Sequence, residues 1–257
     1  MTSHSTRIVY GLRPVEELLR SGREVALVYL AAAGDAERER RGAWKGIIEA
    51  AAQRKIAIED RTREELDALT GGGVHQGVAA IAGEFAYVAA EDLVDEAEAR
   101  GEPPLLLALD SVQDPQNLGA LVRSAHVLGA HGLLLPKDRA AHVTPAVVKA
   151  SAGATEHVKI ALCTNLVREL EALKERGVWI AGALADGGQE PWQIDLAAPT
   201  CLVLGAEGKG LRPLVARACD VRVKIPMAGL VASLNVSAAG AVLLYEALRQ
   251  RRAKRPA

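Results

Sequence analysis

Three stretches of the sequence combine residue types that could do chemistry, and each follows a run of apolar residues. The first, DSVQDPQNLGALVRSA, begins at Asp110 and contains Asn117 and Arg123. Arg123 stands among apolar neighbours such as Leu121 and Val122, and an arginine in that setting needs an anionic partner. The stretch therefore favours a guanidinium that binds an anion or stabilises a negative charge. A helix cap followed by a solvated arginine explains the same residues.

The second stretch, LGAEGKGLRP, contains three glycines within six residues. Glycines at this density allow a backbone to approach a ligand closely. Gly follows Lys209, where a Walker A loop needs Ser or Thr, and the glycine order is not that of a G-x-G-x-x-G fingerprint. Glu207 lies inside the stretch and would repel a pyrophosphate, so a phosphate-binding loop is disfavoured. A simple turn remains the alternative.

The third stretch, IPMAGLVASLNVSAAGAVLLYEALRQ, begins with a strand end and a flexible loop. Ser233 or Asn235 is a competent N-cap for the helix that follows. Residues 236–248 are apolar nearly all round, which predicts a helix that lies in the core or in a subunit interface. A helix cap without any further role is the alternative for SLNVS.

Composition limits the class of protein that carries these stretches. The chain has 257 residues, 49% of them apolar and 25% charged, which is typical of one or two globular domains. Aromatic residues make up only 3%, which argues against binding nucleic acid through many stacked rings. Three cysteines without C-x-x-C spacing predict buried apolar side chains rather than disulfides or zinc. The sequence shows no secretory signal and no run long enough to span a membrane.

Charge and apolar pattern predict how the stretches are positioned. An acidic linker of net charge −5, residues 85–102, separates a small α/β domain, 1–84, from a domain of net charge +5, 103–257. In the second domain, apolar runs predict strands over 105–110, 132–136, 178–184, 200–205 and 220–226. Helices are predicted over 117–129, 166–176 and 235–252. This alternation predicts a doubly wound parallel sheet, which binds ligands at the carboxyl ends of its strands.

In order, spacing and content, the three stretches resemble the SpoU (TrmH-type) RNA ribose 2′-O-methyltransferases. The family's motifs are matched by PQNLGALVRSA, LVLGAEGKGL and the third stretch, while IVYGLRPVEELL and GGGVHQGVAA resemble its small substrate-binding domain. The segment LLLPKDRAAHVTPAVVKASAGA favours the RlmB branch, which methylates a guanosine ribose in the peptidyl-transferase loop of 23S ribosomal RNA. The resemblance implies a trefoil-knotted α/β domain whose chain threads a loop from residue 200 onward. Periodicity alone predicts an open sheet, because knots are rare.

The resemblance also implies the catalytic residues. Arg123 would stabilise a developing alkoxide or hold a phosphate, since a guanidinium rarely acts as a base. Glu207 would orient Arg123 through a charge-assisted pair. Asn117 would position Arg123 or the ribose, and Ser233 and Asn235 would complete a polar floor. Six helical residues turn by roughly 600°, so Asn117 and Arg123 share a site only if Asn117 lies at the helix start or in the loop before it.

The implied cofactor is S-adenosylmethionine, and no metal is expected, since the histidines have no metal-ligand spacing. The backbone at three positions would hold its adenosine, with three side chains beside it; these residues are Gly205, Ile225 and Leu234, then Leu204, Gly208 and Met227. The implied partners are 23S ribosomal RNA and a second copy of the chain, in the cytoplasm and away from membranes. The basic tail 249–255 would contact RNA or be solvated. His75 and Gln76 would contact RNA or form a turn before a strand.

Other functions remain open on the sequence. Within the same class, the substrate could be a transfer RNA or another ribosomal site, as for a resistance methylase. A catalytically silent RNA-binding assembly factor is the alternative from a different class, although every motif residue is present. The absent G-x-G-x-x-G fingerprint disfavours a dehydrogenase.

Overall fold

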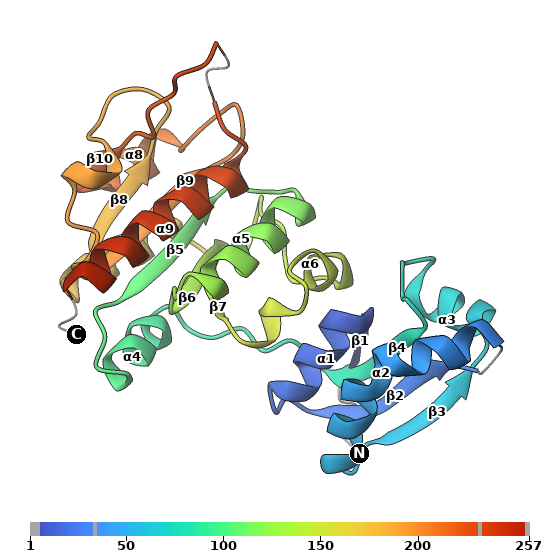
Figure 1. The fold of residues 1–257 in the computed structure, drawn as a ribbon. Helices are drawn as coiled ribbons and strands as arrows, with labels where there is room; N and C mark the ends of the chain where they lie inside the picture. The colour runs from blue at the N-terminus through green and yellow to red at the C-terminus, as the bar shows by residue number, and fades with distance from the viewer. Residues whose placement is uncertain (1–5, 33–34, 231–232, 255–257) are drawn as a thin grey trace. The chain divides into compact units, whose positions relative to one another are not determined.

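A computed structural model describes residues 6–32, 35–230 and 233–254, and packing divides the chain into two units. Unit 1 comprises the chain up to Ala86 together with Val143–His157. Unit 2 comprises Tyr87–His142 and the chain from Val158 onward (Figure 1). Each unit has its own sheet and its own apolar core.

Unit 1 is built around a mixed four-stranded sheet in the order β1-β4-β2-β3. Strand β4 runs antiparallel to β1 and β2, and β2 runs parallel to β3. The strands are β1 (Thr6–Tyr10), β2 (Val25–Ala31), β3 (Ala57–Arg61) and β4 (Val78–Gly83), and the helices before residue 86 are α1 (Leu12–Arg20), α2 (Asp35–Gln53) and α3 (Arg63–Thr70). The pattern Thr62-x-x-Glu65 predicts a capping box, and α3 begins with one: the Thr62 and Glu65 side chains accept from each other's backbone N–H groups.

A segment from the middle of the sequence completes unit 1. It contains α6 (Pro145–Ala150) and the 3-10 turn η1 (Ala154–Glu156), and Val148 lies in the unit 1 core. The fully buried Glu156 carboxylate accepts two hydrogen bonds from Arg7, at 2.9 and 2.6 Å, and lies 3.5 Å from the Arg23 guanidinium. Both guanidinium groups also lie over the Phe85 ring, at 5.5 and 5.0 Å from its centre. A buried ion-pair network therefore fixes this segment to the N-terminal strand.

Unit 2 contains a six-stranded, all-parallel sheet in the order β10-β8-β9-β5-β6-β7. The strands are β5 (Leu105–Asp110), β6 (Gly132–Pro136), β7 (Lys159–Cys163), β8 (Trp179–Ala183), β9 (Thr200–Gly205) and β10 (Val221–Val223). The helices are α4 (Glu91–Ala99), α5 (Pro115–Val127), α7 (Leu166–Glu175), α8 (Pro213–Ala218) and α9 (Val236–Lys254), with the 3-10 turn η2 (Pro191–Gln193). Every residue of β5 is buried, as expected for a strand covered on both faces.

The strand order places a switch point between β5 and β9. From β5 the chain moves outward to β6 and β7, while β9, β8 and β10 lie on the other side of β5. Helices α5 and α9 pack side by side on one face of this central region (Figure 1). In open parallel sheets the crevice at such a switch point, outside the carboxyl ends of the strands, is where ligands bind.

Much of the predicted secondary structure in this unit is confirmed. The strands over 105–110, 132–136 and 200–205 match to the residue. Helix α5, however, begins at Pro115 with Asp114 as its N-cap, two residues before the predicted start at Asn117. Strand β7 and helix α8 of this unit were not predicted, because runs of five or six residues give too little periodicity. The threading of the chain end into a knot stays a prediction.

The packing also differs from the sequence-based division at 84 and 102. Helix α4 lies within the predicted acidic linker, yet its Leu93, Val94 and Ala97 are fully buried in the unit 2 core. Residues 143–157 lie within the predicted second domain, yet they pack with unit 1. Both segments carry apolar residues at helical spacing, and these residues pack into a core. The predicted boundaries rested on the charge pattern, which does not show such packing.

The three cysteines are free thiols, as the sequence predicted. Cys163 and Cys201 are buried and Cys219 is half-buried. Burial raises the pKa of the Cys163 and Cys219 thiols to about 11, so both are protonated at neutral pH. In the described part of the chain, no helix is long and apolar enough to cross a membrane.

The contact between α9 and the core of unit 2 leads to a stability prediction. A Cβ at Gly240 would overlap the Leu121 side chain and lie 2.8 Å from the Cδ1 atom of Leu204. We expect Gly240→Ala to lower the free energy of unfolding by about 2 kcal/mol, because overpacking outweighs the gain in helix propensity. The matched control is Gly42→Ala in α2, where a Cβ meets nothing within 4 Å; it should raise stability by up to about 1 kcal/mol. Urea unfolding followed by circular dichroism measures both, and equal effects would contradict the close packing.

Candidate active site

A cavity of about 320 Å³ lies at the carboxyl ends of β8, β9 and β10 in unit 2. Its lining includes all six residues predicted to hold a cofactor: Leu204, Gly205, Gly208, Ile225, Met227 and Leu234. Two of the five predicted catalytic residues, Glu207 and Ser233, also line it. The second and third chemical stretches of the sequence therefore meet at one cavity, at the sheet edge where ligands were expected.

The lining is apolar apart from a few polar groups. Asp186 and Glu207 contribute carboxylates, and no Lys or Arg is among the described residues that line the cavity. A site with two carboxylates and no cation favours a neutral or positively charged ligand and disfavours a pyrophosphate. In the sequence, Glu207 alone argued against a bound pyrophosphate. The second carboxylate in the cavity, that of Asp186, strengthens this argument.

The glycine-rich loop after β9 folds back on itself. The Gly210 N–H donates to the Ala206 carbonyl at 2.8 Å, and the two residues form a short antiparallel bridge. A Cβ at Gly205 would overlap the Gly210 backbone, so only glycine fits there. Gly208 and Gly210 adopt left-handed conformations, with φ of 77° and 65°. These glycines are thus required by the fold of the loop as well as by any ligand.

A buried carboxylate anchors this loop to the centre of the sheet. Asp110, the last residue of β5, is fully buried and accepts hydrogen bonds from the Arg212 backbone N–H at 2.7 Å and from its Nε at 2.6 Å. The Ser111 hydroxyl donates to the same carboxylate at 3.3 Å. No role for Asp110 or Arg212 was predicted from the sequence. The available signal was the single charged residue that ends the apolar strand LLLALD.

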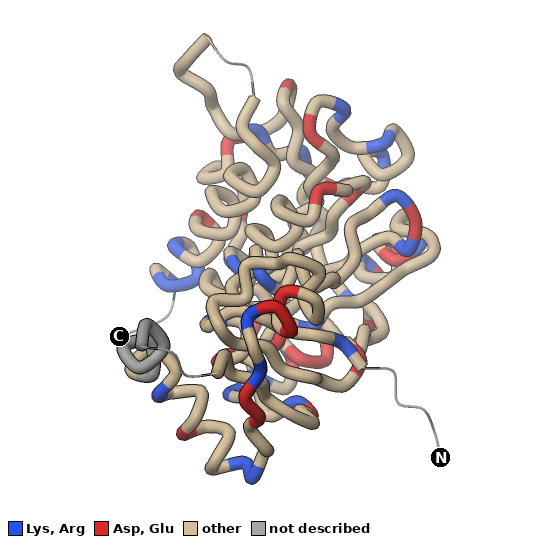
Figure 2. Tube along the Cα trace, turned by 90° about the vertical axis from the view of Figure 1, so that its right-hand side faces the viewer, with Lys and Arg blue, Asp and Glu red and all other residues tan. Residues whose placement is uncertain are grey.

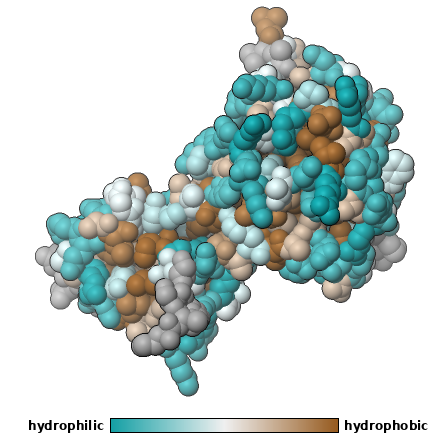
Figure 3. All heavy atoms as spheres, turned by 180° about the vertical axis from the view of Figure 1, so that it is seen from behind, coloured by the Kyte–Doolittle hydropathy of each residue, from teal (hydrophilic) through white to brown (hydrophobic). Residues whose placement is uncertain are grey.

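The third loop continues from β10 past Met227 to Leu230. Leu230 is fully exposed, and the tip of the loop stands out from the surface as an apolar projection (Figure 3). The loop returns through Ser233 to Asn235, whose Oδ1 accepts hydrogen bonds from the Ser237 backbone N–H and hydroxyl, at 2.9 and 2.6 Å. Asn235 is therefore the N-cap of α9, one of the two residues that the sequence proposed for that position.

A direct hydrogen bond joins two of the predicted catalytic residues. Asn235 donates from Nδ2 to Oδ1 of Asn117 at 2.9 Å. Asn117 lies in the first turn of α5, where its backbone N–H donates to the Asp114 carboxylate at 3.4 Å. The bond links the N-terminal ends of α5 and α9. Because Asn235 directly follows Leu234, this polar pair lies next to the cavity lining along the chain.

Arg123, like Asn117 and Asn235, is a predicted catalytic residue that does not line the cavity. It lies six residues beyond Asn117 on α5 and is exposed, and it is not among the lining residues. In the described part of the chain, neither Arg123 nor Glu207 has an ion-pair partner, so the predicted pair between them is not formed within the chain. The rotation of roughly 600° over six helical residues places Arg123 on a different face of α5 from Asn117.

The loop after β8 was missed by sequence reasoning. Leu184, Ala185 and Asp186 line the cavity from this loop. The signal was available, since these residues end or follow the predicted strand 178–184 and therefore lie at the same edge as the other two loops.

No metal centre is formed by the described residues, which contain no group of three or more candidate ligands. His131 is buried, and its Nδ1 accepts the Leu105 backbone N–H at 3.0 Å. Burial lowers the pKa of His131, so the ring is held neutral in a structural role.

Comparison with known proteins identifies relatives of both parts of the chain. Residues 104–245 match the SpoU rRNA Methylase family, and residues 8–88 match a domain described as RNA 2′-O ribose methyltransferase substrate binding. The chain is 44% identical to the 23S rRNA (guanosine-2′-O-)-methyltransferase RlmB of Pseudomonas syringae pv. tomato, over 96% of this chain and 97% of the relative. The same-named protein of Pseudomonas aeruginosa is 43% identical over 95% and 96%.

A solved structure is also similar over nearly the whole chain. It is the SpoU methyltransferase AviRb from Streptomyces viridochromogenes in complex with the cofactor AdoMet. The TM-score is 0.78 at 26% sequence identity, and the match covers 96% of this chain and 91% of that one.

The Asp110 anchor can be tested directly. Asp110→Asn keeps the shape of the side chain but removes the charge and places an amide where Arg212 donates. We expect a loss of about 3 kcal/mol in the free energy of unfolding. Amide hydrogen exchange over residues 206–212 should also become faster, because the loop loses its attachment. Asp195→Asn is the control, since its pair with Lys254 has both side chains about 60% exposed and should cost at most about 1 kcal/mol. Equal losses in the two variants would show that Asp110 does not anchor the loop.

Proposed function

Because the chain belongs to the SpoU rRNA methylase family, we propose that it transfers a methyl group from S-adenosylmethionine to a ribose 2′-hydroxyl of RNA. The proposed target is a guanosine in the peptidyl-transferase loop of 23S ribosomal RNA, in line with the RlmB relatives. The observation that carries the proposal is that the six residues expected to hold the cofactor line one cavity.

The cavity suits the cofactor in its chemistry. S-adenosylmethionine supplies an electrophilic methyl group on a positively charged sulfonium. Leu204, Ile225 and Leu234 offer apolar contacts for a flat adenine, and Gly205 leaves its backbone accessible. Asp186 and Glu207 give the lining a negative character that suits a cationic ligand.

The polar residues take the roles of positioning and charge stabilisation. The Asn117–Asn235 pair is fixed at two helix starts, so it can hold a ribose without losing side-chain freedom on binding. Ser233 presents a hydroxyl to the cavity. Arg123 stabilises the negative charge that develops on the 2′-oxygen as its proton passes to water, in keeping with a guanidinium that stays protonated.

The position of Arg123 supports a homodimer. Its own chain does not place it at the cavity, so we infer that a second copy provides the Arg123 that acts there. Helix α9 packs one face on α5 and exposes apolar side chains on the other, with Val242 43% and Tyr245 60% exposed. An apolar helix face in water is a candidate subunit interface, one of the two locations that the sequence predicted for this helix.

Basic residues support RNA as the substrate. Arg251, Arg252 and Lys254 form the last turn of α9, visible in blue near the C-terminus (Figure 2). Lys254 pairs with Asp195 and Arg251 donates to backbone carbonyls such as that of Leu196, so Arg252 is the residue of this turn best placed to contact a phosphate and make binding dependent on salt. Arg255, the last residue of the predicted basic tail, lies outside the described residues. We propose the cytoplasm as the location of the protein, in keeping with a ribosomal RNA substrate.

The reaction and the role of Arg123 are tested together. We expect labelled methyl transfer from S-adenosylmethionine to unmodified 23S RNA, at one guanosine of the peptidyl-transferase loop. Arg123→Ala should lower the rate by about 100-fold or more while cofactor binding, measured by calorimetry, is unchanged. Arg168→Ala, an exposed arginine on α7, is the control and should retain full activity.

Other outcomes separate the alternatives. Transfer to transfer RNA alone would assign the chain to the sister branch of the family. RNA binding without transfer to either RNA would favour the silent assembly factor. Full activity of Arg123→Ala would remove that residue from the mechanism.

Subunit mixing tests whether Arg123 acts across the dimer. Arg123→Ala and Leu234→Asp should each be inactive, the first in charge stabilisation and the second in cofactor binding. In a mixed dimer one composite site retains both an intact cavity and an intact Arg123. We therefore expect an equimolar mixture to recover about a quarter of wild-type transfer. No recovery, with mixed dimers verified by mass spectrometry, would show that Arg123 serves its own chain.

A further inference from the structure

Unit 1 contains a second cavity that the proposed reaction does not use. Its volume is about 560 Å³, within the range of about 300–1,000 Å³ common for ligand sites. The lining comes from α1, α2, α3 and the loop before β4, and it includes Trp44, Arg63, Asp67 and His75. The cofactor cavity is lined only by residues of unit 2, so this is a separate site.

Trp44 carries the observation that points to a ligand. Its side chain is only 2% exposed, and its indole N–H has no hydrogen-bond partner. Among the described residues it is the one buried side-chain polar atom in this condition. Buried donors are nearly always paired, because leaving one unpaired is unfavourable. Because this N–H is closed to solvent, the acceptor of a ligand would satisfy it only after a shift of the indole or of the 72–76 loop.

The loop opposite Trp44 is built to a defined shape. Gly77 has φ of 80°, and a Cβ there would lie 2.7 Å from Cζ2 of Trp44, so glycine allows the loop to lie against the indole. The buried His75 accepts the Gly77 N–H on Nδ1 at 3.0 Å, which leaves the proton on Nε2, facing Asp67 at 3.2 Å. Gln76 adopts a left-handed conformation, and its Oε1 accepts hydrogen bonds from the Leu12 N–H and from Lys149.

The charges of the lining indicate the type of ligand. One guanidinium, of Arg63, and one carboxylate, of Asp67, line the cavity and balance each other. Leu12, Ala43 and Val74 are apolar. A phosphate would find one cation and one anion, whereas a flat neutral ring with an acceptor edge fits an indole donor, an imidazole and apolar walls. Unpaired RNA bases are recognised in this way, through edge hydrogen bonds and contacts with aromatic and guanidinium groups.

We propose that the unit 1 cavity binds one unpaired nucleobase of the substrate RNA, with the Trp44 indole N–H donating to an acceptor on that base. The inference rests on the proposed function, because it takes RNA as the substrate. It assigns Trp44 and the 72–76 loop to substrate specificity, by recognition of a base that is not the methylated one.

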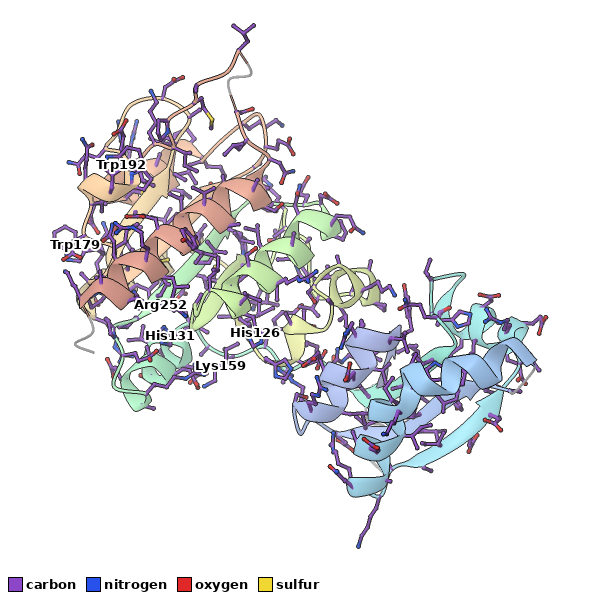
Figure 4. All side chains as sticks on the ribbon, viewed as in Figure 1. His126, His131, Lys159, Trp179, Trp192 and Arg252 are labelled. Carbon is purple, nitrogen blue, oxygen red and sulfur yellow. The ribbon has the colours of Figure 1, made fainter. Side chains whose placement is uncertain are left out.

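Fluorescence of a single tryptophan tests the site. Trp179 and Trp192 are 59% and 58% exposed in unit 2 (Figure 4), so Trp179→Phe with Trp192→Phe leaves Trp44 as the reporter. This double variant should methylate 23S RNA at the wild-type rate. Titration with a 23S fragment spanning the peptidyl-transferase loop should quench or shift the emission. The matched control, Trp44→Phe with Trp179→Phe, keeps only Trp192, and its emission should not change when the fragment is added.

Substituted RNAs then locate the base. Each unpaired nucleotide of the fragment is replaced in turn by an abasic one. We expect one abasic position, other than the methylated guanosine, to abolish the emission change and to weaken RNA binding by about tenfold. Trp44→Phe should weaken binding of the intact fragment by a similar factor. The same variant should bind the RNA with that abasic position about as weakly as the wild-type protein does.

The possible results distinguish this inference from the proposed function. If the fragment is bound and methylated but no abasic position alters the emission, the nucleobase site is wrong and the proposed function stands. If the emission responds to free nucleosides but not to the RNA, the assignment of the base to RNA is overturned. Absence of methyl transfer by the wild-type protein overturns the proposed function, whatever Trp44 reports.

Discussion

The buried Asp110 carboxylate is the constraint on which the active-site region depends. A charge at the end of a fully apolar strand is tolerated only because Arg212 supplies two donors to it. That requirement fixes the far end of the glycine-rich loop, and helix α8 begins directly after Arg212. The near end of the loop is fixed because β9 lies beside β5 in the sheet. The loop between them can then turn only through glycine conformations, and the cavity forms against it.

Local chemistry made much of this arrangement predictable from the sequence. Apolar runs located the central strands, the Thr62–Glu65 pair located a helix start, and glycine density located the loop after β9. The expectation that ligands gather at the carboxyl ends of parallel strands brought two of the three stretches to one cavity. The start of α5 was misplaced because Asp114, Pro115 and Asn117 are all acceptable at a helix start, and only the backbone shows which residue caps it.

The remaining features depend on contacts between residues distant in the sequence. Arg212, the partner of Asp110, lies 102 positions from it, and Arg7, a partner of Glu156, lies 149 positions away; neither pairing leaves a trace in local periodicity. Whether Arg123 is exposed depends on which face of α5 packs against α9. The unpaired N–H of Trp44 can be recognised only from the structure, which shows both that the indole is buried and that no acceptor of the described residues lies within reach of it. Sequence patterns specify elements well and specify long-range polar pairs poorly, because such pairs need no particular spacing.

The segment 143–157 has a consequence for how proteins of this architecture can be recombined. The polypeptide passes between the two units three times, so the N-terminal unit is encoded in two separate pieces. Exchanging only the first 86 residues for those of a homologue would bring a foreign strand and a foreign arginine pair to Glu156. Such a chimera would inherit an ion-pair network whose halves come from different parents. The smallest exchangeable module is therefore discontinuous, and substitutions at Arg7, Arg23 and Glu156 are expected to be accepted together or not at all.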